Sequence, residues 1–350
     1  MKKSFLPVVA TALLLFVGAC QRESLVIPIV EEDETLKDEL YTPDVLIDHV
    51  AIGVADKEQW TWDGKTLRSI ALTGSTEGKT TFLYADNRVS KVVTSTDKVR
   101  ILHYTYANGK MNRYNVDVDG EQEASVTVTR NGEGRIGGAD INFSGRYVLD
   151  LVDRYRNGDD ALVTARPAYR PAMEQLSTTM EWMGVSDADV DSKLDHNFKL
   201  TYNWYDGNVA SEVMNGEVRL EIDPQRVAED LTFLPDNLRL LVYTYLVSHN
   251  KLPVKVGFSN VATYTFDEEK NPYHGYQGDG LTARNLSKNN ILTATTSGNI
   301  RVSLLISGRE ITLSNRDINE KVELTYLYNE AGYPVQISGN GLTVLTYCDK

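Results

Sequence analysis

Nine Asn-Gly or Asp-Gly pairs are spread along this chain of 350 residues. Both residues of such a pair tolerate positive φ, which two-residue hairpin turns between antiparallel strands require. The pairs begin at Asp63, Asn108, Asp119, Asn131, Asn157, Asp206, Asn215, Asp279 and Asn340. Apolar and polar residues alternate beside many of them, as in residues 99–106, 198–205 and 342–347, which is typical of strands with one buried face.

We therefore predict a mainly β fold, in which a large antiparallel meander forms a curled or partly closed, half-barrel sheet with a few short helices in the middle third. A sheet of this length must twist and curl, or close, to protect its edges. Residues 171–183 place Met173, Leu176, Met180 and Met183 on one helical face. A second helix is predicted from Asp223 as N-cap and Pro224 as first residue, and a third over residues 238–247.

The N-terminus has the layout of a secretory signal, with Lys2 and Lys3 before an apolar run that is too short to span a bilayer comfortably. Val17-Gly18-Ala19-Cys20 resembles the lipobox of bacterial lipoproteins, although Val17 stands where Leu is more usual. The resemblance implies cleavage before Cys20 and lipidation of that residue. The alternative is an ordinary signal peptide with a chance cysteine.

These features divide the chain into a signal peptide (residues 1–19), a lipidated N-terminus with a flexible acidic tether (20–43) and a β-rich domain (44–350). The domain is either one continuous sheet or two sheet units, 44–165 and 198–350, joined by a helical segment, 166–197. Gln21, rather than Asp, follows Cys20. By analogy with the envelope sorting rule, we predict an outer-membrane anchor, and leave open which side of that membrane the domain faces.

The composition of the chain narrows the range of functions that it can have. The net charge of −13 argues against nucleic acid as a partner, because phosphate contacts need clustered Lys and Arg. The five histidines lack the short spacing of a zinc site, and we find no nucleophile elbow, dinucleotide-binding loop or Walker loop. We therefore expect no cofactor and no metal site, and assign no catalytic residue. Cys348 is interpreted as a small strand or tail residue.

Two acidic runs suggest calcium-binding loops, but both match the pattern of such a loop poorly. Carboxylates at residues 187, 189, 191 and 195 follow the order of a calcium loop, but Ser192 and Phe198 replace its Gly and its bidentate Glu. Asp117, Asp119, Glu121 and Glu123 alternate along a hairpin. Acidic loops and solvent-facing strands explain both runs more simply.

Aromatic residues two positions apart recur on the predicted strands and would place two rings on one strand face. One interpretation is a stacking platform for a glycan or another flat ligand. The other is cross-strand packing, in which each aromatic pair contributes roughly 0.2–1 kcal/mol. The candidate ligand-binding residues are Trp60, Trp62, Tyr104, Tyr106, Tyr202 and Trp204.

The recurrent unit, as in residues 104–109 and 326–332, resembles YD-type repeats. Residues 264–273 and 286–290 resemble a family of Bacteroidetes cell-envelope lipoproteins of unknown function with a porin-like fold. That resemblance implies a curled or barrel-like sheet and an envelope location, but no site residues.

Two classes of function stay open. One is a non-enzymatic, lipid-anchored envelope protein that binds a glycan, a lipid or a partner protein. The other is a secreted or surface hydrolase that acts on glycans through unidentified carboxylates. A dry, apolar interior would point to lipid.

Overall fold

The computed structural model describes residues 40–54, 56–74, 77–156, 170–182, 196–222, 236–249, 251–339 and 341–348. The predicted signal segment, Cys20, the helix from Asp223 and the acidic run at residues 187–195 lie outside these ranges.

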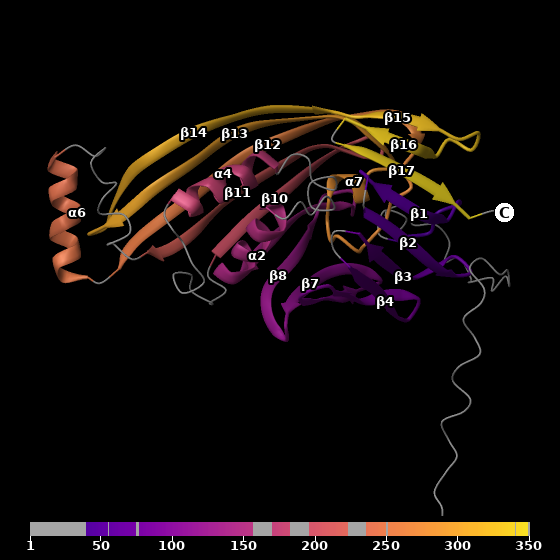
Figure 1. Cartoon of the computed structure of the whole chain (residues 1–350), viewed down its shortest axis with the longest axis horizontal. Coiled ribbons are helices and arrows are strands. Elements are labelled where there is room, and N and C mark those ends of the chain that lie inside the picture. The colour runs from indigo at the N-terminus through magenta and orange to yellow at the C-terminus, as the bar shows by residue number, and fades with distance from the viewer. Residues whose placement is uncertain are drawn as a thin grey trace, which may run out of the picture.

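The 17 strands of the described residues belong to one sheet, in which consecutive strands pair antiparallel at every step but one (Figure 1). The strands are β1 (Ile47–Ile52), β2 (Asp56–Asp63), β3 (Thr66–Thr73), β4 (Gly78–Ala85), β5 (Arg88–Ser95), β6 (Val99–Ala107), β7 (Lys110–Val118), β8 (Glu121–Arg130), β9 (Ile136–Phe143), β10 (His196–Tyr205), β11 (Asn208–Ile222), β12 (Leu252–Lys270), β13 (Asn289–Ile306), β14 (Arg309–Glu323), β15 (Thr325–Tyr328), β16 (Pro334–Ser338) and β17 (Leu342–Tyr347). The predicted mainly β meander is confirmed.

The sheet returns on itself and nearly closes into a barrel. β9 pairs with β10, so that strands before and after the helical segment lie in the same sheet, and β17 pairs with β1. Among the described strands, the one consecutive step without a ladder is from β14 to β15. Only Leu324 separates these two strands, and its backbone N–H donates to the carbonyl of Leu292 in β13 (2.8 Å). The chain therefore bends at Leu324 from pairing with β13 to pairing with β16.

Apolar side chains occupy the inner face of this sheet. Along β12, residues 252, 254, 256, 258, 260, 262 and 264 are buried, whereas residues 259, 261, 263 and 265 are exposed. The same alternation runs through the neighbouring strands β11 and β13. Because the period of a strand is two, one face of each strand joins a continuous apolar core.

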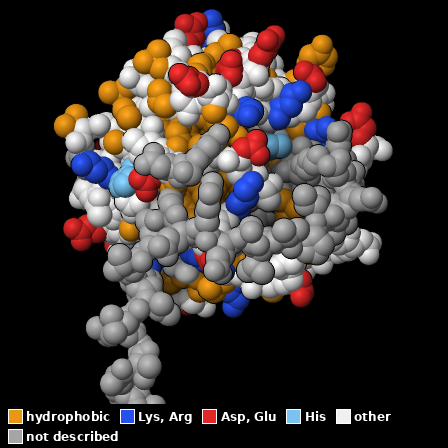
Figure 2. All heavy atoms as spheres, turned by 90° about the vertical axis from the view of Figure 1, so that its right-hand side faces the viewer, with side chains coloured by type: hydrophobic (Ala, Val, Ile, Leu, Met, Phe, Trp, Pro, Cys, Tyr) orange, Lys and Arg blue, Asp and Glu red, His pale blue; other side chains and the backbone are white. Residues whose placement is uncertain are grey.

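The outer face is mainly polar. In the long strands a row of ion pairs crosses it: Arg219 to Glu217 (2.6 Å), and Lys255 to both Glu217 (3.9 Å) and Glu310. Figure 2, which faces the end where β1 and β17 lie, shows charged side chains across the surface with hydrophobic ones between them. A transmembrane barrel has the reverse arrangement, with apolar residues on its outer, lipid-facing side.

Within the described ranges, four helices accompany the sheet: α2 (Gly145–Arg156), α4 (Arg170–Trp182), α6 (Asp236–Ser248) and α7 (Ala283–Leu286). The helices predicted over residues 171–183 and 238–247 are confirmed as α4 and α6. The sequence interpretation missed α2, although Ser144 is a suitable N-cap, and its hydroxyl accepts from the backbone N–H of Tyr147 (3.1 Å). Both α2 and α4 lie against the sheet, where α2 contacts β8 and β11, and α4 contacts β14 and α2 (Figure 1).

Two predicted hairpin turns are wrong. Asn108-Gly109 turns between β6 and β7 with both φ angles positive, as predicted. Asn215-Gly216, however, lies within β11, because β10 and β12 pair with that strand continuously on either side. Asp279-Gly280 lies in the connection between β12 and β13, where the loop folds inward instead of turning back at once.

The Asn215-Gly216 position generates a stability prediction. Gly216 faces Phe198 across the β10–β11 ladder, and an added Cβ would lie 1.8 Å from Cδ1 of that ring and 2.6 Å from the Asn197 carbonyl oxygen. Overpacking of this kind costs about 1–3 kcal/mol. We expect Gly216→Ala to lower the free energy of unfolding by that amount in urea denaturation. The control is Gly257→Ala in β12, where the nearest atom is 4.0 Å away. Equal stability of the two variants would contradict this packing.

Candidate binding interior

The short-strand end of the barrel is filled by a loop of the chain itself. Residues 271–288, which connect β12 to β13 and include α7, are almost all buried. We call this segment the plug loop. Tyr104 on β6 donates to the carbonyl of Gln277 in the plug loop (2.5 Å). On the other side of the loop, the backbone N–H of Lys288 donates to the carbonyl of Gly207 (3.2 Å).

Aromatic rings hold the plug loop in place. Tyr276 contacts Trp60 and Phe82 of the sheet, with ring centroids 5.4 and 6.0 Å apart. Tyr41, which precedes β1, packs against Tyr276 (5.5 Å) and donates its hydroxyl to the carbonyl of Pro272 (2.9 Å). The described chain therefore begins beside the plug loop.

Several buried polar groups of the plug loop are paired within it. Asn271 donates to the carbonyls of Arg284 (2.6 Å) and Ser287 (2.8 Å), and accepts from the backbone N–H of Tyr273 (2.9 Å). The Arg284 guanidinium stacks over the Tyr273 ring at 4.1 Å and binds Asp279 at 2.7 Å. Pairing of this kind allows polar groups of a loop to be buried at modest cost.

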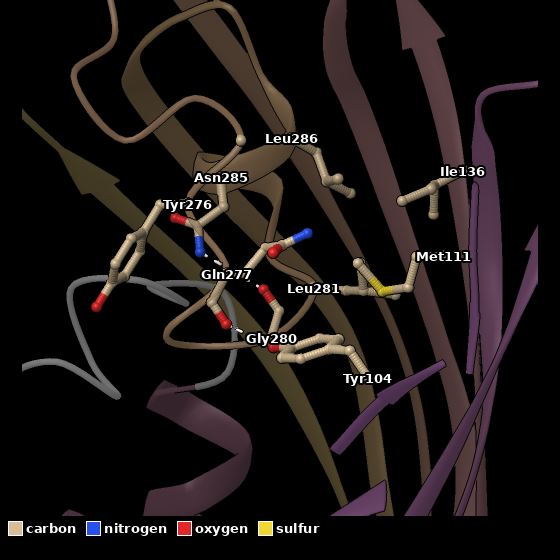
Figure 3. A pocket seen from close by; sticks show the side chains of 10 residues that line it. Tyr104, Met111, Ile136, Tyr276, Gln277, Gly280, Leu281, Asn285 and Leu286 are labelled. Carbon is tan, nitrogen blue, oxygen red and sulfur yellow. Dashed lines mark hydrogen bonds between the residues drawn. The ribbon is translucent and has the colours of Figure 1, made fainter. Parts of the chain in front are cut away.

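A small cavity remains between the plug loop and the sheet (Figure 3). Its volume is about 10 Å³, which is room for roughly one water molecule. Met111 and Ile136 line it from β7 and β9, and Leu281 and Leu286 from the plug loop. In this structure the cavity is too small for a glycan or an acyl chain.

Three of the predicted ligand-binding residues surround the plug loop. Trp60, Trp62 and Tyr104 are buried on the inner face. The indole N–H of Trp60 donates to Glu58 (2.9 Å), and that of Trp62 donates to the carbonyl of Ile47 (2.6 Å). Burial raises the pKa of the Tyr104 hydroxyl well above its ordinary value, so that this group stays protonated as a donor.

The other three also lie on the inner face, on β6 and β10. Tyr202 is buried. Tyr106 donates to the carbonyl of Val89 (2.9 Å), and Trp204 donates to that of Ile136 (2.7 Å) with Arg135 over its ring. The structure brings the six residues together only as part of one core, and their role in ligand binding stays a prediction.

The alternating carboxylates of residues 117–123 each have a partner. Asp117 contacts His103 (2.9 Å), Asp119 accepts from the backbone N–H of Val99 (2.9 Å), and Glu121 contacts Arg146 (2.6 Å). Glu123 is buried and accepts from the Ser144 hydroxyl; burial raises the pKa of its carboxyl group. Glu123 thus supports the N-cap of α2. Within the described ranges, no group of three or more His, Cys, Asp or Glu residues could hold a metal ion.

The long-strand half has a different interior. The inner faces of β11 to β13 carry fully buried aliphatic residues such as Leu220, Val256 and Leu304. Helix α4 turns Leu176 and Met180 inward and leaves Glu174 and Thr178 exposed. The sheet there is covered by short helices and not by further strands.

Polar residues interrupt this apolar face at two adjacent levels. Asn260 on β12 and Glu212 on β11 are each 4% exposed, and Thr296 on β13 is 2% exposed. Tyr264 donates to Glu212 (3.1 Å). The sequence interpretation missed this group. The sequence signal for this group is Asn260, because every other residue at the even-numbered positions from 252 to 264 is apolar.

Comparison with known proteins adds little to this geometry. No family model and no curated protein matches the chain. Among solved structures, the chain is similar to a porin-like protein from Bacteroides uniformis, with 10% identity, a TM-score of 0.26, and coverage of 86% of this chain and 97% of that one. A similarity at these values carries no argument about the fold, which rests on the strand pairing alone. In the described residues, no helix has the length and apolar character needed to cross a membrane.

Proposed function

We propose that this protein is a lipid-anchored, non-enzymatic protein of the cell envelope that binds an apolar chain, such as the acyl chain of a lipid. The supporting observation is the long-strand half of the sheet, whose apolar inner face is covered by α2 and α4. The acyl chain would lie between that face and the helices.

The energetics favour such a ligand. Each methylene that leaves water contributes about 0.8 kcal/mol, so a chain of ten or more carbons would offset the loss of the α4 contacts it replaces. Met173 and Met180 of α4 are unbranched and adapt readily to ligands of different shape. Helices packed on an open inner face are more easily displaced than hydrogen-bonded strands, whose ladders would have to break.

A glycan is a poorer candidate. Sugar stacking requires accessible ring faces, whereas Trp60, Trp62, Tyr104 and Tyr202 are at most 7% exposed. The hydrolase alternative would require paired carboxylates of raised pKa in a cleft. Glu123 has a raised pKa, but it is engaged with Ser144 beneath α2.

The anchor is the second part of the proposal. Twenty peptide units separate Cys20 from Leu40, where the described chain begins beside the plug loop. Fully extended, they reach at most roughly 70 Å. We propose that lipid on Cys20 holds the protein at the outer membrane, with the polar outer face of the sheet in water and the acyl-binding interior within reach of the bilayer.

The ligand is tested with the Cys20→Ser protein, which carries no anchor lipid. We expect organic extraction to release lipid detectable by mass spectrometry, and the delipidated protein to bind N-phenyl-1-naphthylamine. Met180→Glu, on the buried face of α4, should weaken probe binding at least about tenfold, because a charge is costly in an apolar contact. The control Thr178→Glu, on the exposed face, should bind as the parent does. Absence of both lipid and probe binding from a folded protein would refute the proposal.

The anchor is tested in growing cells with an alkyne fatty-acid probe. We expect the wild-type protein to be labelled and to fractionate with the outer membrane, and Cys20→Ser to lose both properties, because two or more acyl chains are needed for stable attachment. Cys348→Ser is the matched control and should behave as the wild type. Unchanged labelling of Cys20→Ser would exclude this anchor.

A further inference from the structure

Asn260 is a buried amide that makes no side-chain hydrogen bond to any described residue. Its side chain is 4% exposed and lies on the inner face near the middle of β12. Neither Nδ2 nor Oδ1 has a partner within the part of the chain that the structure describes. Buried polar groups are almost always paired, because an unpaired one loses its hydration without compensation. The position therefore calls for a partner from outside the sheet.

Two residues flank Asn260 on the inner face. Across the ladders, Asn260 faces Met214 on β11 and Gly298 on β13. A Cβ on Gly298 would lie 2.4 Å from Oδ1 of Asn260, so the amide occupies the space above this glycine. The absence of a side chain at residue 298 is therefore what makes space for this amide on the inner face.

The next level of the sheet is also polar. Glu212, Ala262 and Thr296 are paired with one another across β11, β12 and β13, and the Tyr264 hydroxyl donates to Glu212. This group lies toward the plug loop, whereas apolar residues such as Phe258 and Ile300 continue from Asn260 in the other direction. Asn260, Glu212 and Thr296 therefore form a narrow polar band that interrupts the apolar inner face.

We propose that Asn260 binds the polar head of the apolar ligand, with the ligand's chain along the apolar part of β12 and β13. This inference rests on the proposed function. An Asn side chain offers both a donor and an acceptor. The complementary head is an uncharged group that also accepts and donates, such as a primary amide or a hydroxyl. A carboxylate head would leave Oδ1 without a donor.

The test compares two ligands of equal chain length, decanamide and 1-chlorodecane, as competitors of N-phenyl-1-naphthylamine on the delipidated Cys20→Ser protein. Only the amide head can satisfy both atoms of Asn260. We expect wild-type affinity for decanamide to exceed that for 1-chlorodecane by about tenfold or more, the size expected from one to two net hydrogen bonds. Asn260→Leu should abolish that preference and retain the affinity for 1-chlorodecane.

Asn260→Leu should fold, because it replaces an unpaired polar group by an apolar one of similar size. Asn299→Leu, the same change on the outer face of β13, is the control and should keep the preference. Thr296→Val is a second variant, next to the proposed head site, and should reduce the preference. Equal wild-type affinity for the two ligands would overturn the head-group site, because it would mean that Asn260 binds only a water. The proposed function would still stand. Failure of both ligands to compete would overturn both.

Discussion

The structure depends on the separation of apolar and polar side chains between the two faces of one antiparallel sheet. Burial of apolar area stabilises by roughly 25 cal/mol per Å², so every strand is held with the same face inward. A shift of one residue in any ladder would send that face outward. In β12 the inward positions from Leu252 to Tyr264 are apolar except at Asn260. This separation favours near-closure of the sheet, since a flat sheet would leave this face in water.

Near-closure has different consequences at the two ends. Around the short strands the plug loop and Tyr41 fill the interior, and every one of the predicted ligand-binding rings becomes part of that core. The strands of the other end are 15 to 19 residues long in β11 to β14, and their inner face is covered by α2 and α4. The half with the helical cover is therefore where an apolar ligand could replace protein contacts.

Local signals in the sequence were enough for the strands and for two helices. Alternation and turn pairs such as Asn108-Gly109 act within a few residues, as does the spacing of Leu176 and Met180 in α4. The features that the sequence did not predict depend on residues that are far apart in the chain. Gly216 lies in a strand because Phe198 and β12 pack around it. The plug loop is buried because it packs against Trp60 and Tyr104, which are far away in sequence. The unpaired state of Asn260 likewise depends on which side chains face it across β11 and β13.

Cysteine labelling along β12 tests the inward and outward faces most directly. In a Cys20→Ser, Cys348→Ser background, single substitutions Val256→Cys, Phe258→Cys and Ala262→Cys alternate with Ser259→Cys, Val261→Cys and Thr263→Cys. We predict rapid maleimide labelling of the folded protein at residues 259, 261 and 263, and labelling at residues 256, 258 and 262 only after unfolding. Equal rates in the two sets, or protection of the second set instead of the first, would contradict a sheet with an apolar interior and a water-facing exterior.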